Sequence, residues 1–450
     1  MNDVISHSQA FRSRRFWNWF PMGLTYALLY MGRYNLTVSK NALGSLMNKE
    51  DFGFIFGIGA VIYAISFLIN GPLVDRIGGK KGILIAALGA GAMNLTMGLY
   101  VNHVLGLPNP AQASLSTVFT VLYGINMYFQ SYGAASIVKV NAHWFHIRER
   151  GVFSGIFGIM IASGVFLAFD GTGYFIKSSL VVGKGYNGGD ALWWIFLLPA
   201  ALLFLFAVIE SVLLKDTPAQ AGFDDFDTQD ESSGEDLKAK IPTLQLYKRI
   251  LTHPVILTVA LIEFCTGVLR NGVMHWYSIF ASEHIKAGIT AGWKFTSENW
   301  GLILWIAGII GGVSAGVISD KLFQSRRGPS AGFLYGLLVL CVIGMFFSLE
   351  NGLILAVLTF LMSVAVIGTH GLLSGTATMD FGGRKGAATA VGIIDGFVYL
   401  GTGFQSMILG FLTTKSWNYW PLFLLPFSLI GLLLLIRIWN AKPGQKGNTH

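Results

Sequence analysis

The sequence predicts an all-α membrane protein with about twelve transmembrane helices, arranged as two pseudo-symmetric bundles of six. The first reason is composition, since 53% of the 450 residues are hydrophobic and only 12% are charged. About a quarter of the residues in a typical soluble domain are charged, so water cannot be the main solvent of this surface. The second reason is a series of long apolar stretches, and the third is the recurrence of charged motifs in both halves.

Each apolar stretch is long enough to form one membrane-crossing helix. Such a helix needs roughly 20 apolar residues, because the hydrocarbon core is about 30 Å thick. We expect spans near residues 17–38, 52–74, 82–102, 115–139, 151–173, 192–214, 253–277, 298–319, 331–349, 352–377, 386–413 and 418–438.

The loops predict the orientation of the chain. Arg and Lys gather in both tails and after the even-numbered spans, and basic loops favour the cytoplasmic side, so we expect both termini in the cytoplasm. The net charge of +8 is therefore a topology signal and indicates no nucleic-acid partner. The acidic stretch DDFDTQDESSGED predicts a disordered linker, which gives an N-terminal bundle over 1–214, a cytoplasmic linker over 215–250 and a C-terminal bundle over 251–450.

The two halves repeat one another in detail. The first span of each carries one arginine at mid-depth, Arg33 and Arg270. An Asp followed by basic residues comes after the second span of each half, in GPLVDRIGGKKG and AGVISDKLFQSRRG, and a charged turn precedes each fifth span. These matches at near-equal spacing predict an internal duplication.

At these motifs the chain resembles the major facilitator superfamily, and more narrowly the organophosphate:phosphate antiporters, which include glycerol-3-phosphate, hexose-phosphate and phosphoglycerate transporters. The narrower resemblance covers nearly the whole chain and is carried by YALLYMGRYN, FQSYG, HWFHIRERG, KDTPAQAG, VLRNGVMHWY, SDKLF and GGRKGAATAVG. It implies the major facilitator fold, a phosphorylated small-molecule substrate and inorganic phosphate as counter-substrate. It also implies a multi-pass, monomeric protein of a bacterial cytoplasmic (inner) membrane.

Three positions depart from the family pattern. Tyr34 and His275 stand where glycerol-3-phosphate transporters have a Lys and an Asp, and Ile161 stands at the place of a histidine in the fifth span. These departures leave phosphate recognition in place, while they weaken the case for obligatory exchange with phosphate.

Arg33 and Arg270 are the main candidates for substrate binding. An unpaired guanidinium inside a membrane costs at least about 2.5 kcal/mol, so each is expected to face a polar cavity or a partner. Two planar forks can donate parallel hydrogen bonds to one phosphate. Tyr26 and Tyr30 lie on the same helical face as Arg33, and Tyr399 is a further candidate. Alternatively, the arginines pair with buried acids and the tyrosines are packing residues.

Several other ionisable residues are secondary candidates. Lys139 is a further substrate-binding candidate, although it can also reach the membrane interface. Asp395, Glu263, His275 and His370 are candidates for proton coupling or charge balance, against the alternative of hydrogen bonding between helices. Charged residues at the cytoplasmic loops are candidates for gating, against a simple role in topology: Asp75, Arg76, Asp320, Lys321 and Arg150.

The predicted function is secondary transport of a small organophosphate by alternating access. No catalytic triad, zinc-binding spacing or nucleotide-binding loop is present in the sequence, so we expect no enzyme activity, metal or cofactor. Proton symport is the nearest variant of exchange. Two further alternatives stay open: a symporter for another small organic anion such as a carboxylate, and a transporter-like sensor of sugar phosphates.

Overall fold

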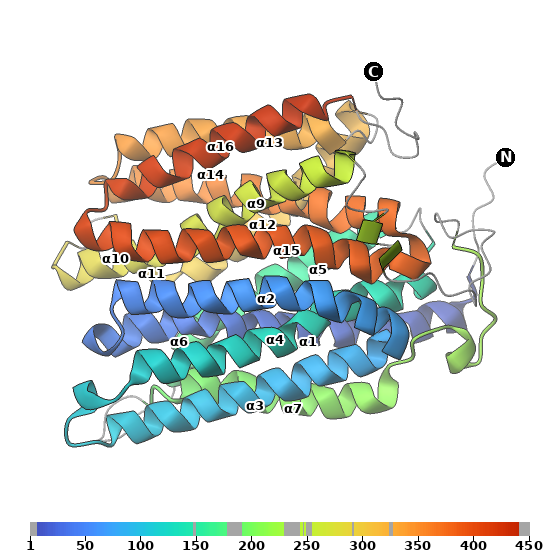
Figure 1. Cartoon of the computed structure of the whole chain (residues 1–450), viewed down its shortest axis with the longest axis horizontal. Coiled ribbons are helices and arrows are strands. Elements are labelled where there is room, and N and C mark those ends of the chain that lie inside the picture. Colours follow the sequence, from blue (N-terminus) through green and yellow to red (C-terminus); the bar gives the residue numbers. More distant parts are fainter. Residues whose placement is uncertain are drawn as a thin grey trace.

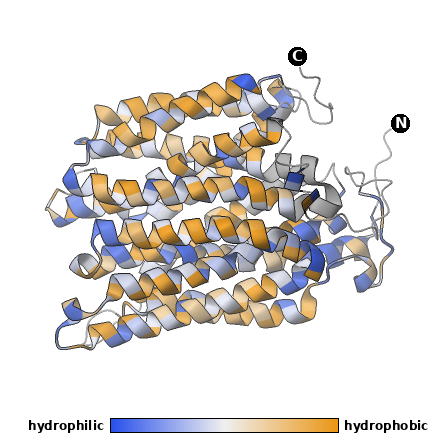
Figure 2. Cartoon of the chain, in the orientation of Figure 1, coloured by the Kyte–Doolittle hydropathy of each residue, from blue (hydrophilic) through white to orange (hydrophobic). Residues whose placement is uncertain are grey.

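The structure is a computed structural model that describes residues 7–146, 150–177, 191–228, 244–245, 247–248, 254–289, 292–323 and 327–440. It is built from helices that run side by side (Figure 1). Hydrophobic residues fill the middle of these helices and hydrophilic residues gather toward their ends (Figure 2). This distribution is typical of helices that cross a bilayer.

Every predicted span coincides with a helix or with a helix continued by a π-helical segment. The N-terminal helices are α1 (Gln9–Leu43), α2 (Lys49–Ile77), α3 (Gly79–Leu105), α4 (Leu115–Trp144), α5 (Arg150–Phe166), α6 (Thr172–Ile176) and α7 (Trp194–Leu213), with α5 and α6 joined through the π-helical segment Leu167–Gly171. The C-terminal helices are α9 (Pro254–Met274), α10 (Trp276–Lys286), α11 (Lys294–Glu298), α12 (Trp300–Val317), α13 (Arg327–Phe346), α14 (Gly352–His370), α15 (Ala377–Lys415) and α16 (Tyr419–Arg437).

Two of the predicted spans are less apolar than the rest. Among the described residues, 10 helices are long and apolar enough by composition alone to cross a membrane, and α1 and α4 are not among them. Both have ample length, at 35 and 30 residues. They carry buried polar side chains, including Arg33 and Asn35 on α1 and Asn126 and Gln130 on α4. Their polarity therefore arises from residues directed into the protein.

Two helix pairs form most of the contact between the halves, and α4 also packs on α15. α2 packs on α15, and α5 packs on α12. These are the second and eleventh spans and the fifth and eighth spans, so a two-fold rotation that exchanges the halves also exchanges the two pairs. In Figure 1 the N-terminal helices form the lower part and the C-terminal helices the upper part, and α1 begins at the same end of the bundle at which α16 ends. The two-bundle, pseudo-symmetric fold is confirmed.

Two glycines bring α9 and α15 into close contact. A Cβ atom on Gly267 would lie 1.9 Å from the carbonyl oxygen of Val398, and a Cβ on Gly401 would lie 2.1 Å from that of Phe264. Real Cβ atoms do not approach so closely, so only glycine allows this separation of the backbones. The contact places Arg270 of α9 next to Tyr399 of α15.

The first part of the predicted linker is ordered. Asn18 and Lys215 are joined by two hydrogen bonds, from Asn18 Nδ2 to the Lys215 carbonyl at 3.1 Å and from the Lys215 N–H to Asn18 Oδ1 at 2.8 Å. Asp216 accepts the backbone N–H of Lys80 at 2.7 Å. The expectation of disorder is therefore wrong for residues 215–228, while the acidic residues from 229 to 243 lie outside the described part of the chain.

Candidate functional site

Arg33 lies at the centre of the molecule with all its donor nitrogens engaged. Its side chain, on α1, is 1% exposed. Nε donates to Gln130 Oε1 at 3.0 Å, Nη2 donates to the Tyr63 hydroxyl at 2.9 Å, and Nη1 donates to the Tyr399 hydroxyl. The guanidinium carbon also lies 4.5 Å from the Tyr30 ring centroid. Neighbours from several helices thus hold this guanidinium in one orientation.

Arg270, on α9, has a different environment, although it is also buried at 4% exposure. Its guanidinium carbon lies 5.6 Å from the centroid of the Tyr399 ring. Within the described part of the chain, its Nε and Nη2 atoms have no hydrogen-bond partner. A buried unpaired donor costs about 1–3 kcal/mol, and more when the group is charged. Arg270 therefore has two buried donors that the described residues leave unpaired.

Tyr399 lies beside both arginines. Its hydroxyl accepts from Arg33, and the central carbons of Arg33 and Arg270 lie 5.2 and 5.6 Å from the centroid of its ring. Arg33 belongs to the N-terminal half, whereas Tyr399 and Arg270 belong to the C-terminal half. The two arginines thus approach the same tyrosine at the boundary between the halves.

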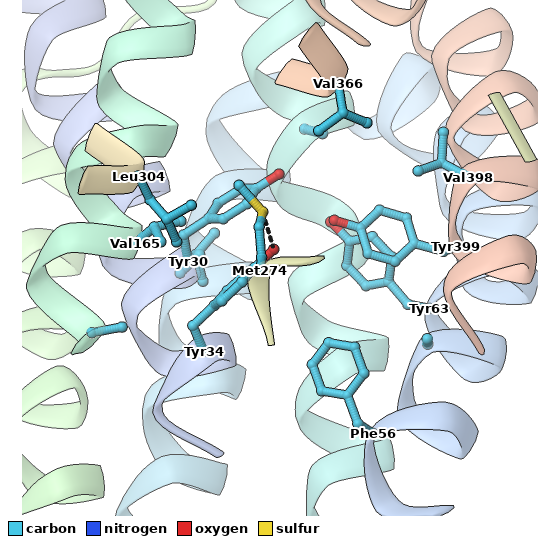
Figure 3. Close-up of a cluster of buried hydrophobic side chains, with 14 of the residues drawn as sticks. Tyr30, Tyr34, Phe56, Tyr63, Val165, Met274, Leu304, Val366, Val398 and Tyr399 are labelled. Carbon is cyan, nitrogen blue, oxygen red and sulfur yellow. Dashed lines mark hydrogen bonds between the residues drawn. The ribbon is translucent and has the colours of Figure 1, made fainter. Parts of the chain in front are cut away.

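A group of tyrosines surrounds this point. Figure 3 shows the hydroxyls of Tyr30, Tyr63 and Tyr399 turned toward the same interior region, with Tyr34 below Tyr30. Tyr26 packs edge-on against Tyr30, with ring centroids 5.2 Å apart. The structure therefore brings together Arg33, Arg270 and all three tyrosines that the sequence nominated.

The buried acids do not neutralise the arginines. In the described structure, neither Arg33 nor Arg270 forms a salt bridge; Glu263, which is 0% exposed, contacts His370 Nδ1 at 2.8 Å. Asp395 accepts a hydrogen bond from the Ser374 hydroxyl. Within the described residues, neither arginine is therefore in direct contact with a carboxylate.

His275 lies where α9 gives way to α10. Its Nδ1 contacts the Thr37 hydroxyl, and its ring stacks on Tyr34 with centroids 4.6 Å apart. The two residues that depart together from the family pattern thus contact each other across the halves. A stacked aromatic pair occupies the place where the resemblance implies an ion pair.

A cavity of about 60 Å³ borders the arginine pair on the Arg270 side. Its wall includes Tyr30, Tyr34 and Arg270, together with His370 and Ile161. Helices of both halves therefore line a space beside Arg270.

The charged residues nominated for gating lie near the end of the bundle where α1 begins. Asp75 pairs with Lys139 at 3.0 Å within its own half and accepts from the Thr389 hydroxyl of the other half at 3.2 Å. Arg76 and Lys321 are both exposed. The side chains of Asp320 and Arg150 lie outside the described residues.

The sequence did not single out several residues that the structure places at the halves' boundary. Gln130 and Tyr63 hold Arg33. At the opposite end of the bundle from the nominated gate, Lys49 pairs with Glu283 at 3.2 Å, and Asp170 accepts the backbone N–H groups of Gly301 and Leu302 at 3.0 and 2.7 Å. Gln130 falls in the quoted FQSYG motif, whereas Lys49 and Asp170 carry no sequence signal.

Comparisons with known proteins agree with this architecture. The model of the Major Facilitator Superfamily matches residues 22–405. A solved structure of the proton:xylose symporter XylE has the same fold, with a TM-score of 0.67 at 15% identity and 96% coverage of both chains.

Three curated relatives are similar along nearly their whole length. The chain is 23% identical to a glycerol-3-phosphate transporter of Bacillus subtilis (strain 168) (92% of this chain, 90% of that one) and 25% identical to a probable hexose phosphate transport protein of Chlamydia pneumoniae (94% and 90%). It is 22% identical to the membrane sensor protein UhpC of Escherichia coli (strain K12) (93% and 91%). The resemblance to organophosphate transporters is confirmed, and the chain belongs to the Major Facilitator Superfamily, a family of multi-pass membrane transport proteins and not of enzymes.

Proposed function

We propose that this protein is a secondary active transporter that carries a small organophosphate across a membrane by alternating access, in exchange for inorganic phosphate. The observation that carries the proposal is the pair of buried arginines, one from each half, that lie beside Tyr399. The names of two relatives, a glycerol-3-phosphate transporter and a probable hexose phosphate transport protein, support the substrate class. Both termini lie in the cytoplasm, in a monomer of a bacterial inner membrane.

The geometry suits a phosphate group. The phenol oxygen of Tyr399 stands in for one phosphate oxygen at Arg33, because it accepts from Nη1 of that residue. A phosphate adds further acceptor oxygens for Nε and Nη2 of Arg270, which have no partner among the described residues. Hydrogen bonds between a guanidinium and a phosphate are charge-assisted and roughly twice as strong as neutral ones. Binding therefore relieves two unpaired buried donors.

Binding also links the two halves. Arg33 and Arg270 carry like charges, and an anion between them removes the repulsion that opposes closure. On the side of the bundle away from the termini, the Lys49–Glu283 pair and the Asp170 contact with the start of α12 bridge the halves. Those bridges break when that side opens, and the Asp75–Thr389 hydrogen bond breaks when the other side opens. The residues 1–214 and 251–450 are then the two moving units, joined by the linker 215–250.

Two rival functions remain as outcomes of the test. A dicarboxylate also satisfies two arginines, and the resemblance to a membrane sensor protein favours a sensor that binds without transport. Proteoliposomes loaded with phosphate are offered labelled phosphate, a set of labelled phosphate esters and labelled succinate. We expect internal phosphate to stimulate uptake of phosphate and of at least one ester. Uptake of succinate alone, binding without flux, or ester uptake driven only by a proton gradient each overturns the exchange proposal.

A further inference from the structure

The cavity beside Arg270 has a hydrocarbon wall. Apart from Arg270, Tyr30, Tyr34 and His370, the side chains that line its volume of about 60 Å³ are apolar. They come from α5, α9, α12 and α14 and include Ile161, Ala162, Val165, Met274, Leu304 and Ile367. Val165 and Leu304 lie next to each other on the side of the cavity away from Tyr399 (Figure 3).

Two of the polar groups of the wall contact protein atoms. The Tyr34 hydroxyl donates to Asn271 Oδ1 at 3.1 Å. One ring nitrogen of His370 contacts Glu263. A ligand that binds Arg270 with its anionic group therefore meets mostly carbon atoms beyond that group.

We propose that the cargo is a phosphate monoester whose organic part is a short hydrocarbon chain or ring, and not a polyol. This inference rests on the proposed function, because it places the phosphate at the arginine pair. Each methylene buried in the cavity is expected to tighten binding about fourfold. Each hydroxyl that enters without a partner is expected to weaken binding by about fivefold to a hundredfold. The chain thus differs in specificity from relatives named for glycerol-3-phosphate and hexose phosphate.

Two matched ligands test this directly. Propyl phosphate and glycerol-3-phosphate have the same carbon skeleton and differ by two hydroxyls. The full-length protein in detergent is titrated with each in competition with labelled inorganic phosphate. We expect propyl phosphate to displace labelled phosphate at a concentration at least about tenfold lower than glycerol-3-phosphate requires. Affinity is also expected to increase stepwise from methyl through ethyl to propyl phosphate. Equal or tighter binding of glycerol-3-phosphate overturns the inference.

A variant of the wall provides an independent test. Val165→Thr puts a hydroxyl into the cavity at nearly constant volume, so it is expected to shift the ratio of the two affinities toward glycerol-3-phosphate by about fivefold. Val101→Thr, at a valine on α3 that is buried outside the cavity, is the matched control and is expected to leave the ratio unchanged. If the ratio of the two ligand affinities changes equally in both variants, this cavity does not bind the organic part of the cargo.

The result also separates this inference from the proposal on which it rests. If labelled phosphate does not bind, or binds Arg270→Lys as well as the wild type, the arginine pair is not the anion site and both proposals fail. If phosphate binds and depends on Arg270, yet propyl phosphate gains nothing over glycerol-3-phosphate, only the substrate class is wrong.

Discussion

The surroundings of Arg33 and Arg270 differ although the two residues occupy equivalent positions in the two halves. Arg33 donates to Gln130, Tyr63 and Tyr399, whereas Arg270 has two nitrogens without partners in the described structure. The cavity borders Arg270 and not Arg33. Equivalent positions in the two halves therefore hold arginines whose neighbours give them different environments.

This difference suggests a division of roles. Arg33 is a preorganised donor whose orientation the N-terminal half fixes, so it loses little conformational entropy on binding. Arg270 is the donor whose unpaired state makes an anion favourable. If this comparison holds, substitutions at Arg270 affect ligand binding most, and substitutions at Arg33 affect both binding and stability.

The largest effect on binding is expected from Arg270→Lys. Lysine keeps the charge and loses the planar fork, so two charge-assisted hydrogen bonds to phosphate are lost. Phosphate affinity is expected to fall about 100-fold while the melting temperature changes little, because Arg270 makes few hydrogen bonds within the protein. Calorimetric titration and a thermal melt measure the two quantities. Normal affinity in this variant would falsify the bidentate role.

A change of backbone separation tests whether the packing of α9 on α15 positions Arg270. Gly267→Ala puts a methyl group 1.9 Å from the Val398 carbonyl oxygen and is expected to cost about 1–3 kcal/mol of stability and to weaken phosphate binding. Gly336→Ala on α13 is the control, since nothing lies within 4 Å of the added atom. Thermal melts and phosphate titrations are measured for both variants. Equal stability and equal phosphate affinity of the two variants would contradict this account of how Arg270 is positioned.

Arg33→Lys is expected to show the opposite balance from Arg270→Lys. It removes the fixed hydrogen bonds to Gln130 and Tyr63, so the melting temperature falls measurably. Phosphate affinity falls about tenfold, because only one Arg33 nitrogen, the one that donates to Tyr399, is expected to donate to the bound phosphate. A loss of affinity as large as that of Arg270→Lys, without loss of stability, would show that the two arginines are equivalent.

Tyr399→Phe sharpens the comparison at the side chain that lies beside both arginines. Without the hydroxyl, a donor of Arg33 becomes unpaired in the free protein, and an anion that binds satisfies it. We therefore expect phosphate affinity to rise several-fold in an equilibrium titration. A fall in affinity instead indicates that the hydroxyl donates to the bound phosphate and is not displaced by it.

Much of the fold was predictable because its signals are strong and local. Twenty apolar residues in a row have few alternatives to a membrane-crossing helix, and even α1 and α4, with their buried polar residues, were located from length and position. Arg33 and Arg270 were also predictable, since a guanidinium within an apolar stretch is costly and therefore informative.

The partners of these residues were not predictable for a physical reason. In the sequence, nothing distinguishes Tyr63 from the other tyrosines in apolar stretches. Its hydrogen bond to Arg33 depends on how α1 and α2 are rotated about their axes. The Glu263–His370 contact joins residues of α9 and α14, and no local pattern encodes it. The docking of residues 215–228 was missed because composition does not reveal individual hydrogen bonds, such as those between Asn18 and Lys215.

The central claim is that Arg33 and Arg270 bind one and the same phosphate group. Phosphate affinity is measured by calorimetry for the wild type, Arg33→Lys, Arg270→Lys and the double variant. A shared anion predicts coupling, so the double variant loses at least about tenfold less affinity than the product of the two single losses. Losses that multiply independently, to within about twofold, would contradict a shared site.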